Sequence, residues 1–134
     1  MEATTVLVDG SISGKIGTLT LNSPARHNAL SAALIHDLCS GLEEMEKQQV
    51  RVVVVRAPLG STVFSAGHDV RELPTHGRDP LTYDDPLRRA VRCIEMFPAP
   101  VIAMVEGSVW GGACELVMSC DLIVAADDST FAMT

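Results

Sequence analysis

The strongest constraint on the fold is a run of four consecutive valines, Val52 to Val55. The run does not alternate with polar residues, so it predicts a strand buried on both faces, which is typical of a parallel sheet. Val101 to Val105 predicts a second buried strand, and Leu122 to Ala126 predicts a third strand. Because parallel strands need crossover connections that helices usually supply, the sequence predicts an α/β protein.

Apolar residues at helical spacing occupy the stretches between these strands. They predict one helix from Ser31, which can cap it, to about Gln48, and a second helix that begins near Pro86. A third helix should extend from Trp110 to Cys120. Nearer the N-terminus, Thr5 to Asp9 and Gly17 to Leu21 are expected to form two short strands of a hairpin-like pair.

The composition is that of a globular protein and excludes several classes of function. Hydrophobic residues make up 47% and charged residues 20%, which argues against disorder, and the net charge of −7 argues against nucleic-acid binding. The sequence shows neither a signal peptide nor a membrane span, so we expect a cytoplasmic protein without membrane contact. The four cysteines form no CxxC pair and the histidines no HExxH motif, which predicts reduced thiols and no metal site.

Two glycine-flanked segments, each following a predicted buried strand, carry the candidate chemistry. Gly67 precedes His68, and Gly111 precedes Gly112, at the expected beginnings of two helices. The first amides of a helix have no intrahelical acceptor, and a glycine beside them lets a ligand approach closely. If the amides of His68 and Gly112 converge, they form an oxyanion hole made of backbone. Each half alone is more often a tight turn than a catalytic feature.

Several polar residues lie near this hypothetical site. Glu115 falls three residues after Gly112 in an apolar helical stretch, where a carboxylate is costly to bury unless it is paired or used. A salt bridge or a polar edge explains Glu115 equally well. Asp69 should cap a short helix after His68, and Arg26 lies in a loop that can meet a phosphate or simply face solvent. The sequence contains no G-x-S-x-G elbow, Walker A loop or G-x-G-x-x-G motif.

Three strings of residues resemble the crotonase (enoyl-CoA hydratase/isomerase) superfamily in order and spacing. They are Asn28-Ala29-Leu30, Phe64-Ser65-Ala66-Gly67-His68-Asp69, and the run from Glu106 through Trp110-Gly111-Gly112 to Glu115. Within the superfamily, three stretches and the ending of the sequence are most similar to the methylmalonyl-CoA decarboxylases: Ser65 to Asp69, Gly77 to Arg88, Gly107 to Gly112, and Ser129 to Thr134. The resemblance covers nearly the whole chain but only the N-terminal part of the longer chains of that family.

The resemblance implies a crotonase-like ββα superhelix, truncated, with residues 1–134 as the N-terminal portion of an acyl-CoA domain. It implies that the thioester oxygen binds the amides of His68 and Gly112. The loop Ala66, Gly67, His68, Asp69 and Val70 would line the coenzyme A site, and Arg26 would lie near the phosphates. Thr134 would lie beside the acyl group. Glu115 would occupy the position of the first catalytic glutamate of hydratases.

The implied activity is decarboxylation of methylmalonyl-CoA to propionyl-CoA through a thioester enolate, by a lyase that needs no cofactor or metal. Coenzyme A enters only as part of the substrate. The alternatives are an enoyl-CoA hydratase or isomerase and, from another class, an inactive or purely CoA-binding truncated module. The expected partners are the acyl-CoA thioester and further copies of the full-length chain in a trimer or hexamer.

Overall fold

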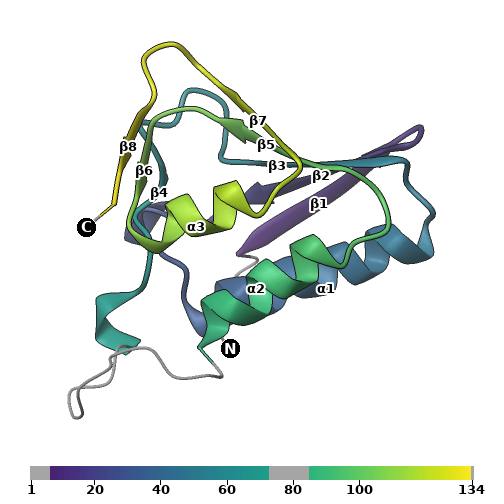
Figure 1. Cartoon of the computed structure of the whole chain (residues 1–134), viewed down its shortest axis with the longest axis horizontal. Helices are drawn as coiled ribbons and strands as arrows, with labels where there is room; N and C mark the ends of the chain where they lie inside the picture. The colour runs from purple at the N-terminus through teal and green to yellow at the C-terminus, as the bar shows by residue number, and fades with distance from the viewer. Residues whose placement is uncertain (1–6, 73–84, 134) are drawn as a thin grey trace, which may run out of the picture.

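The predicted strands form a five-stranded sheet in the computed structural model, which describes residues 7–72 and 85–133. The strand order in this sheet is β1-β2-β3-β5-β7 (Figure 1). The bounds are β1 Val8–Ser13, β2 Ile16–Leu21, β3 Val52–Arg56, β5 Val101–Val105 and β7 Leu122–Ala125. Strands β2, β3, β5 and β7 are mutually parallel, and β1 is antiparallel to β2. The α/β prediction and the parallel sheet are therefore confirmed.

A second, three-stranded sheet was not predicted from the sequence. Its strands are β4 Val63–Ser65, β6 Ser108–Trp110 and β8 Thr130–Ala132, all parallel in the order β4-β6-β8. After β3, β5 and β7, the chain crosses from the first sheet to the second, and in the two earlier cases it then enters a helix (Figure 1). This repeat of two strands and a helix is the expected ββα superhelix.

The first two α-helices each begin directly after a residue whose side chain caps them. Helix α1, Ala32–Lys47, is capped by Ser31, whose side-chain oxygen accepts a hydrogen bond from the Leu34 amide at 3.1 Å. Helix α2, Pro86–Glu95, is capped in the same way by Asp85. Helix α3, Gly112–Met118, is shorter than predicted at both ends, since Trp110 belongs to β6 and Ser119 is the C-cap. The described residues also form two short 3₁₀ helices, η1 Pro24–Arg26 and η2 Val70–Glu72.

The N-terminal hairpin also differs from its prediction. Strand β1 continues to Ser13, so the connection is only the turn at Gly14, whose φ of 62° suits glycine, and Lys15. The start of the predicted first strand, Thr5 and Val6, lies outside the described residues.

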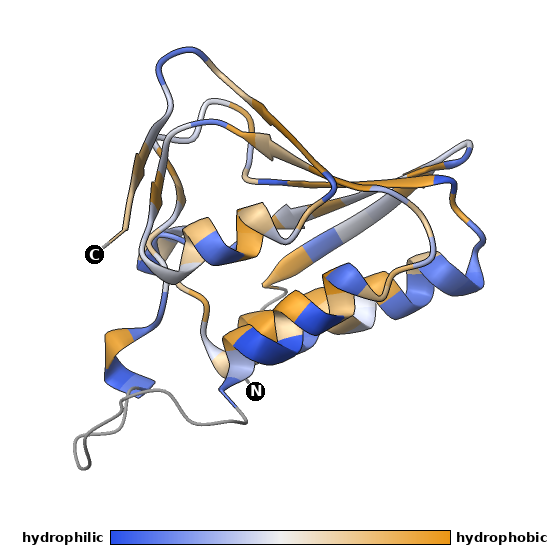
Figure 2. Ribbon diagram, viewed as in Figure 1, coloured by the Kyte–Doolittle hydropathy of each residue, from blue (hydrophilic) through white to orange (hydrophobic). Residues whose placement is uncertain are grey.

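The core lies between the five-stranded sheet and the helices α1 and α2. Val53, Val101 and Leu38 are completely buried there, and Figure 2 shows the hydrophobic strands above the apolar faces of the two helices. The expectation that the valine run is buried on both faces is only half right, because Val52 and Val54 are partly exposed. Strand β7 at the sheet edge is hydrophobic but exposed over all four residues. In the described ranges, no helix is long and apolar enough to cross a membrane.

Candidate functional site

The two glycine-flanked segments meet because their preceding strands are neighbours. Strands β4 and β6 pair in parallel, Val63 with Ser108 and Ser65 with Val109, so their carboxyl ends lie at the same edge of the small sheet. Gly67 has a φ of +86°, and a Cβ on it would lie 2.5 Å from the Trp110 carbonyl oxygen and 3.2 Å from the Gly112 nitrogen. The absence of a side chain at Gly67 therefore lets the two backbones touch.

Hydrogen bonds fix the loop that carries His68. The Leu30 amide donates to the Gly67 carbonyl at 2.7 Å, and the Gly67 amide donates to the Ser65 hydroxyl oxygen at 3.2 Å. Ser65 itself is fully buried and donates to the Asn28 carbonyl at 2.7 Å. Among the described residues, no acceptor is paired with the main-chain amide of His68 or of Gly112. Within this part of the chain, the amides of His68 and Gly112 thus have no paired acceptor, and both lie beside the contact that Gly67 makes with the Trp110–Gly112 backbone.

Asn28 also fixes this loop through its side chain. In the sequence it belongs to the Asn28-Ala29-Leu30 motif of the family resemblance, but no structural role was predicted for it. Its side-chain amide donates to the Phe64 carbonyl at 3.0 Å, and its side-chain oxygen accepts from the Ser23 amide at 2.7 Å. Both His27 and Asn28 adopt left-handed backbone angles, with φ of 52° and 54°. Asparagine tolerates this conformation better than most residues, which is the only local signal that could have identified the turn.

The imidazole of His68 makes contacts that the sequence did not reveal. Its Nε2 lies 3.2 Å from Oδ2 of Asp85, and its other edge lies over Gly112. A Cβ on Gly112 would fall 2.7 Å from Nδ1 and 2.8 Å from Cε1 of the ring, and 3.0 Å from Cδ2 of Leu87. The side chain of His68 therefore bridges the beginning of α2 and the beginning of α3.

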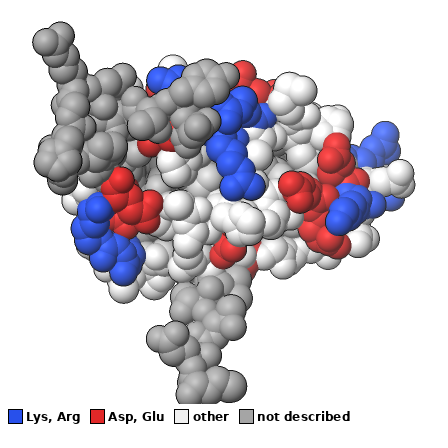
Figure 3. Space-filling view, turned by 90° about the horizontal axis from the view of Figure 1, so that it is seen from below, with Lys and Arg blue, Asp and Glu red and all other residues white. Residues whose placement is uncertain are grey.

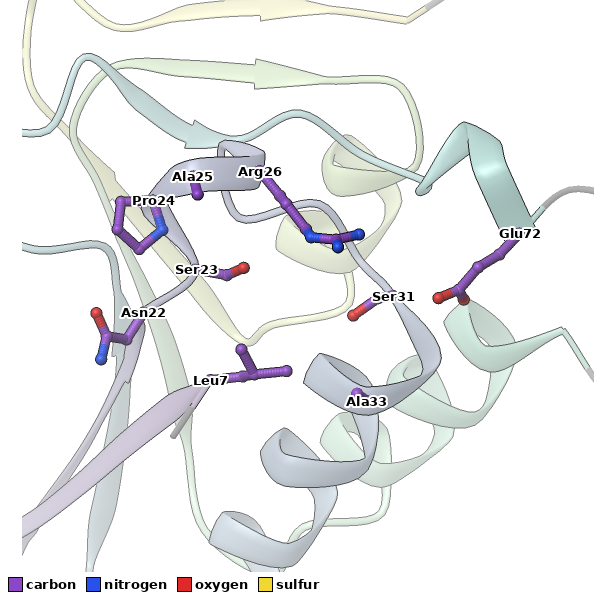
Figure 4. Close-up of a pocket in the computed structure, with 9 residues that line it drawn as sticks. All are labelled: Leu7, Asn22, Ser23, Pro24, Ala25, Arg26, Ser31, Ala33 and Glu72. Carbon is purple, nitrogen blue, oxygen red and sulfur yellow. The ribbon is translucent and has the colours of Figure 1, made fainter. Parts of the chain in front are cut away.

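Asp69 anchors two arginines next to a cavity. The buried carboxylate accepts hydrogen bonds from the Arg71 amide at 3.1 Å and the Arg71 guanidinium at 2.7 and 3.0 Å, and lies 3.4 Å from the Arg26 guanidinium. The predicted capping role of Asp69 is confirmed. Arg26 is half exposed and projects, with Ser23, Ser31 and Glu72, into a cavity of about 460 Å³ (Figure 4).

Of the two interpretations of Glu115, the structure supports the polar edge. The residue lies in the first turn of α3 and its side chain is exposed, so it is not a buried carboxylate. It lines a hollow of about 290 Å³ with Arg88, Val91 and Arg92 of α2. No cation of the described residues lies within ion-pair distance of it. Val70 is also exposed, and Thr134 lies outside the described residues.

The charged residues on the face that Figure 3 shows lie in groups. Acidic and basic side chains lie together at the left and at the right of this view, and a basic group lies between them near the top. The cysteines of the described ranges are free thiols. Burial raises the pKa of Cys39 to about 12, and the neighbouring Cys93 adds to this shift. Burial also raises the pKa of Cys120 to about 12, and the nearby carboxylate of Asp121 makes a smaller contribution in the same direction.

The sequence from residue 11 to 134 matches the model of the enoyl-CoA hydratase/isomerase family. The chain therefore belongs to this family, and its fold is the crotonase fold.

The sequence and the structure are similar to those of particular members of the family. Methylmalonyl-CoA decarboxylase of Escherichia coli (strain K12) is 55% identical over 120 residues, which are 90% of this chain and 46% of that protein. A solved structure of methylmalonyl-CoA decarboxylase in complex with 2-nitronate-propionyl-CoA superposes with a TM-score of 0.92 at 52% identity, covering 96% of this chain and 49% of that one. The mitochondrial enoyl-CoA hydratase domain-containing protein 3 of Rattus norvegicus is 39% identical over 87% of this chain and 39% of its own length. The chain thus spans about half the length of the relatives it matches.

Proposed function

We propose that the full-length natural protein decarboxylates methylmalonyl-CoA to propionyl-CoA. The observation that supports the proposal is the close approach of Gly67 to Trp110 and Gly112, beside which the amides of His68 and Gly112 have no paired acceptor among the described residues. The 55% identity to a methylmalonyl-CoA decarboxylase supports the choice of substrate.

In this mechanism the amides of His68 and Gly112 donate hydrogen bonds to the thioester oxygen. Loss of CO₂ breaks the bond between the α-carbon and the carboxylate, and the electron pair moves into a thioester enolate. The charge develops on the oxygen between the two amides, so these donors bind the transition state more strongly than the ground state. Removing one such donor typically costs about 10²–10³-fold in rate. A proton added to the α-carbon then gives propionyl-CoA.

The remaining predicted site residues have supporting roles in the proposal. Ala66 to Val70 would line the coenzyme A site, and Arg26, which faces the cavity in Figure 4, would meet the CoA phosphates. Arginine suits such contacts because its guanidinium donates several hydrogen bonds in one plane. Glu115 would lie at the acyl end, one turn of α3 from Gly112, and Thr134 would contact the acyl group.

Hydration of an enoyl-CoA is the alternative that one observation favours, because Glu115 is an exposed carboxylate without an ion-pair partner among the described residues, close to the proposed oxyanion site. The test is to incubate the full-length protein with methylmalonyl-CoA and with crotonyl-CoA separately. Release of CO₂ with formation of propionyl-CoA supports the decarboxylase. A hydroxyacyl-CoA formed from crotonyl-CoA, without CO₂ from methylmalonyl-CoA, would favour the hydratase, and binding without turnover would favour a CoA-binding module.

A further inference from the structure

We propose that Asp85 and the imidazole of His68 together form a positioning clamp that sets the relative placement of the two amides. This inference rests on the proposed function, since it explains how the two donors are held. The clamp extends from the beginning of α2, through the His68 ring, to Gly112 at the beginning of α3.

The first link of the clamp is the hydrogen bond between His68 and Asp85. The two side chains lie 3.2 Å apart and are only 19% and 9% exposed. An ionised carboxylate can only accept, so Nε2 of the imidazole carries the hydrogen that bridges them. The same oxygen, Oδ2, also accepts from the Leu87 amide at 3.0 Å. Asp85 is thus fixed at the N-terminus of α2, and the ring is fixed to Asp85.

The second link is the packing of the ring on Gly112. A Cβ on Gly112 would lie 2.7 Å from Nδ1 and 2.8 Å from Cε1 of the ring. The ring therefore occupies the space that a side chain at this position would need. Leu87, which directly follows the first residue of α2, packs against the same point. The ring therefore presses on the residue that carries one donor, while the main chain of His68 carries the other.

The geometry explains why this side chain matters even though its backbone amide is the working group. Two ring atoms of His68 and Cδ2 of Leu87 are the three heavy atoms nearest to the position of a Cβ on Gly112, so the ring supplies the closest packing over this residue. Small displacements of donors are costly, because a misplacement of about 1 Å can lower a rate about 10²-fold. A clamp that limits the separation of the two amides acts on the transition state and leaves binding of the CoA portion unchanged.

The sharpest variant is Asp85→Ser. Serine is also a good N-cap, so α2 keeps its cap, but the shorter side chain cannot reach His68. The clamp predicts a kcat at least about tenfold lower with a nearly unchanged KM, because the lost interaction acts only in the transition state. Asp85→Asn, which keeps both the cap and an acceptor of similar reach, should recover most of the rate.

A double-mutant cycle with His68→Ala separates the clamp from a general structural role. If both side chains act through one hydrogen bond, the double variant Asp85→Ser with His68→Ala should be no slower than the slower single variant. Multiplicative losses, or an Asp85→Ser enzyme with the kcat of the wild type, would overturn the inference.

A measurement that does not depend on turnover keeps the clamp testable if the proposed function fails. In the wild type, ¹⁵N spectra of the His68 ring should show a protonated Nε2, and Asp85→Ser should shift this signal. A wild type that releases no CO₂ from methylmalonyl-CoA refutes the function alone. An Nε2 signal that is the same in Asp85→Ser as in the wild type refutes the clamp alone.

Discussion

Replacing Gly67 by alanine should damage the site more than its small size suggests. The added Cβ would lie 2.5 Å from the Trp110 carbonyl oxygen, so the two backbones must separate by about half an ångström or more to restore normal contact. The left-handed φ of +86° adds about 1 kcal/mol of strain, and overpacking adds about 1–3 kcal/mol. We therefore expect the free energy of unfolding to fall by about 2–4 kcal/mol.

The same substitution should lower kcat, because the backbones that move apart carry the two donors. A shift of this size predicts a loss of about 10- to 100-fold in decarboxylation. The assay is steady-state release of CO₂ from methylmalonyl-CoA, with a thermal melt of each variant in parallel.

Two other glycines supply matched controls for this experiment. Gly60 has a φ of +80° but nothing within 4 Å of a Cβ, so Gly60→Ala reports the backbone strain alone and should leave the rate unchanged. Gly107→Ala combines a φ of +86° with a contact of 2.5 Å to Thr62, so it should destabilise the fold with a smaller effect on kcat. A Gly67→Ala protein that melts lower but turns over like the wild type would refute the reasoning.

Three further predictions concern single groups. Gly112→Pro removes the amide hydrogen at the first position of α3, where the helix itself accepts proline, but its Cβ would also fall 2.7 Å from Nδ1 of His68. Gly112→Ala adds the same Cβ and keeps the amide, so kcat of the proline variant should be about 10²–10³-fold below that of the alanine variant, and equal turnover of the two folded variants would exclude this donor. Asp121→Ala removes the acceptor of the Val101 amide, 2.7 Å away, so urea denaturation should show a loss of about 1–3 kcal/mol without a change in KM; an unchanged midpoint would contradict this. Because the pKa values of Cys39 and Cys120 are raised from 9.0 to about 12, the folded state holds protons that the unfolded state releases. The two thiols should therefore make their full contribution to the free energy of unfolding below pH 9. Above pH 9 the free energy of unfolding should fall, by up to about 1.4 kcal/mol per pH unit for each thiol. Cys39→Ala should show a shallower decline in urea denaturation between pH 8 and 10, and equal slopes would count against the buried thiol.

Much of the fold could be predicted because its signals are local. The valine run, the Ser31 cap and the proline at the start of α2 each determine their own element. The strands β4, β6 and β8 have three residues each, too few to show a period, and their pairing depends on the superhelix as a whole.

The candidate site was predictable only in its backbone. Gly67 and Gly112 are visible in the sequence because glycines follow predicted strands. The partnership of His68 with Asp85 spans 17 positions and depends on how α2 packs beside α3, which no local pattern encodes. The sequence left two environments open for Glu115, and the amphipathic character of α3 decides between them. Its buried residues are Ala113, Cys114, Leu116 and Val117, and Glu115 lies with Met118 on the exposed side. The oligomer and the cytoplasmic location stay predictions.

The most direct test of the proposed chemistry is a crystal structure of the full-length protein with a non-decarboxylating thioester analogue of methylmalonyl-CoA. The proposal predicts that the thioester oxygen lies about 2.7–3.1 Å from both the His68 and the Gly112 nitrogens. A bound analogue whose oxygen meets neither amide, or only a side chain, would contradict it.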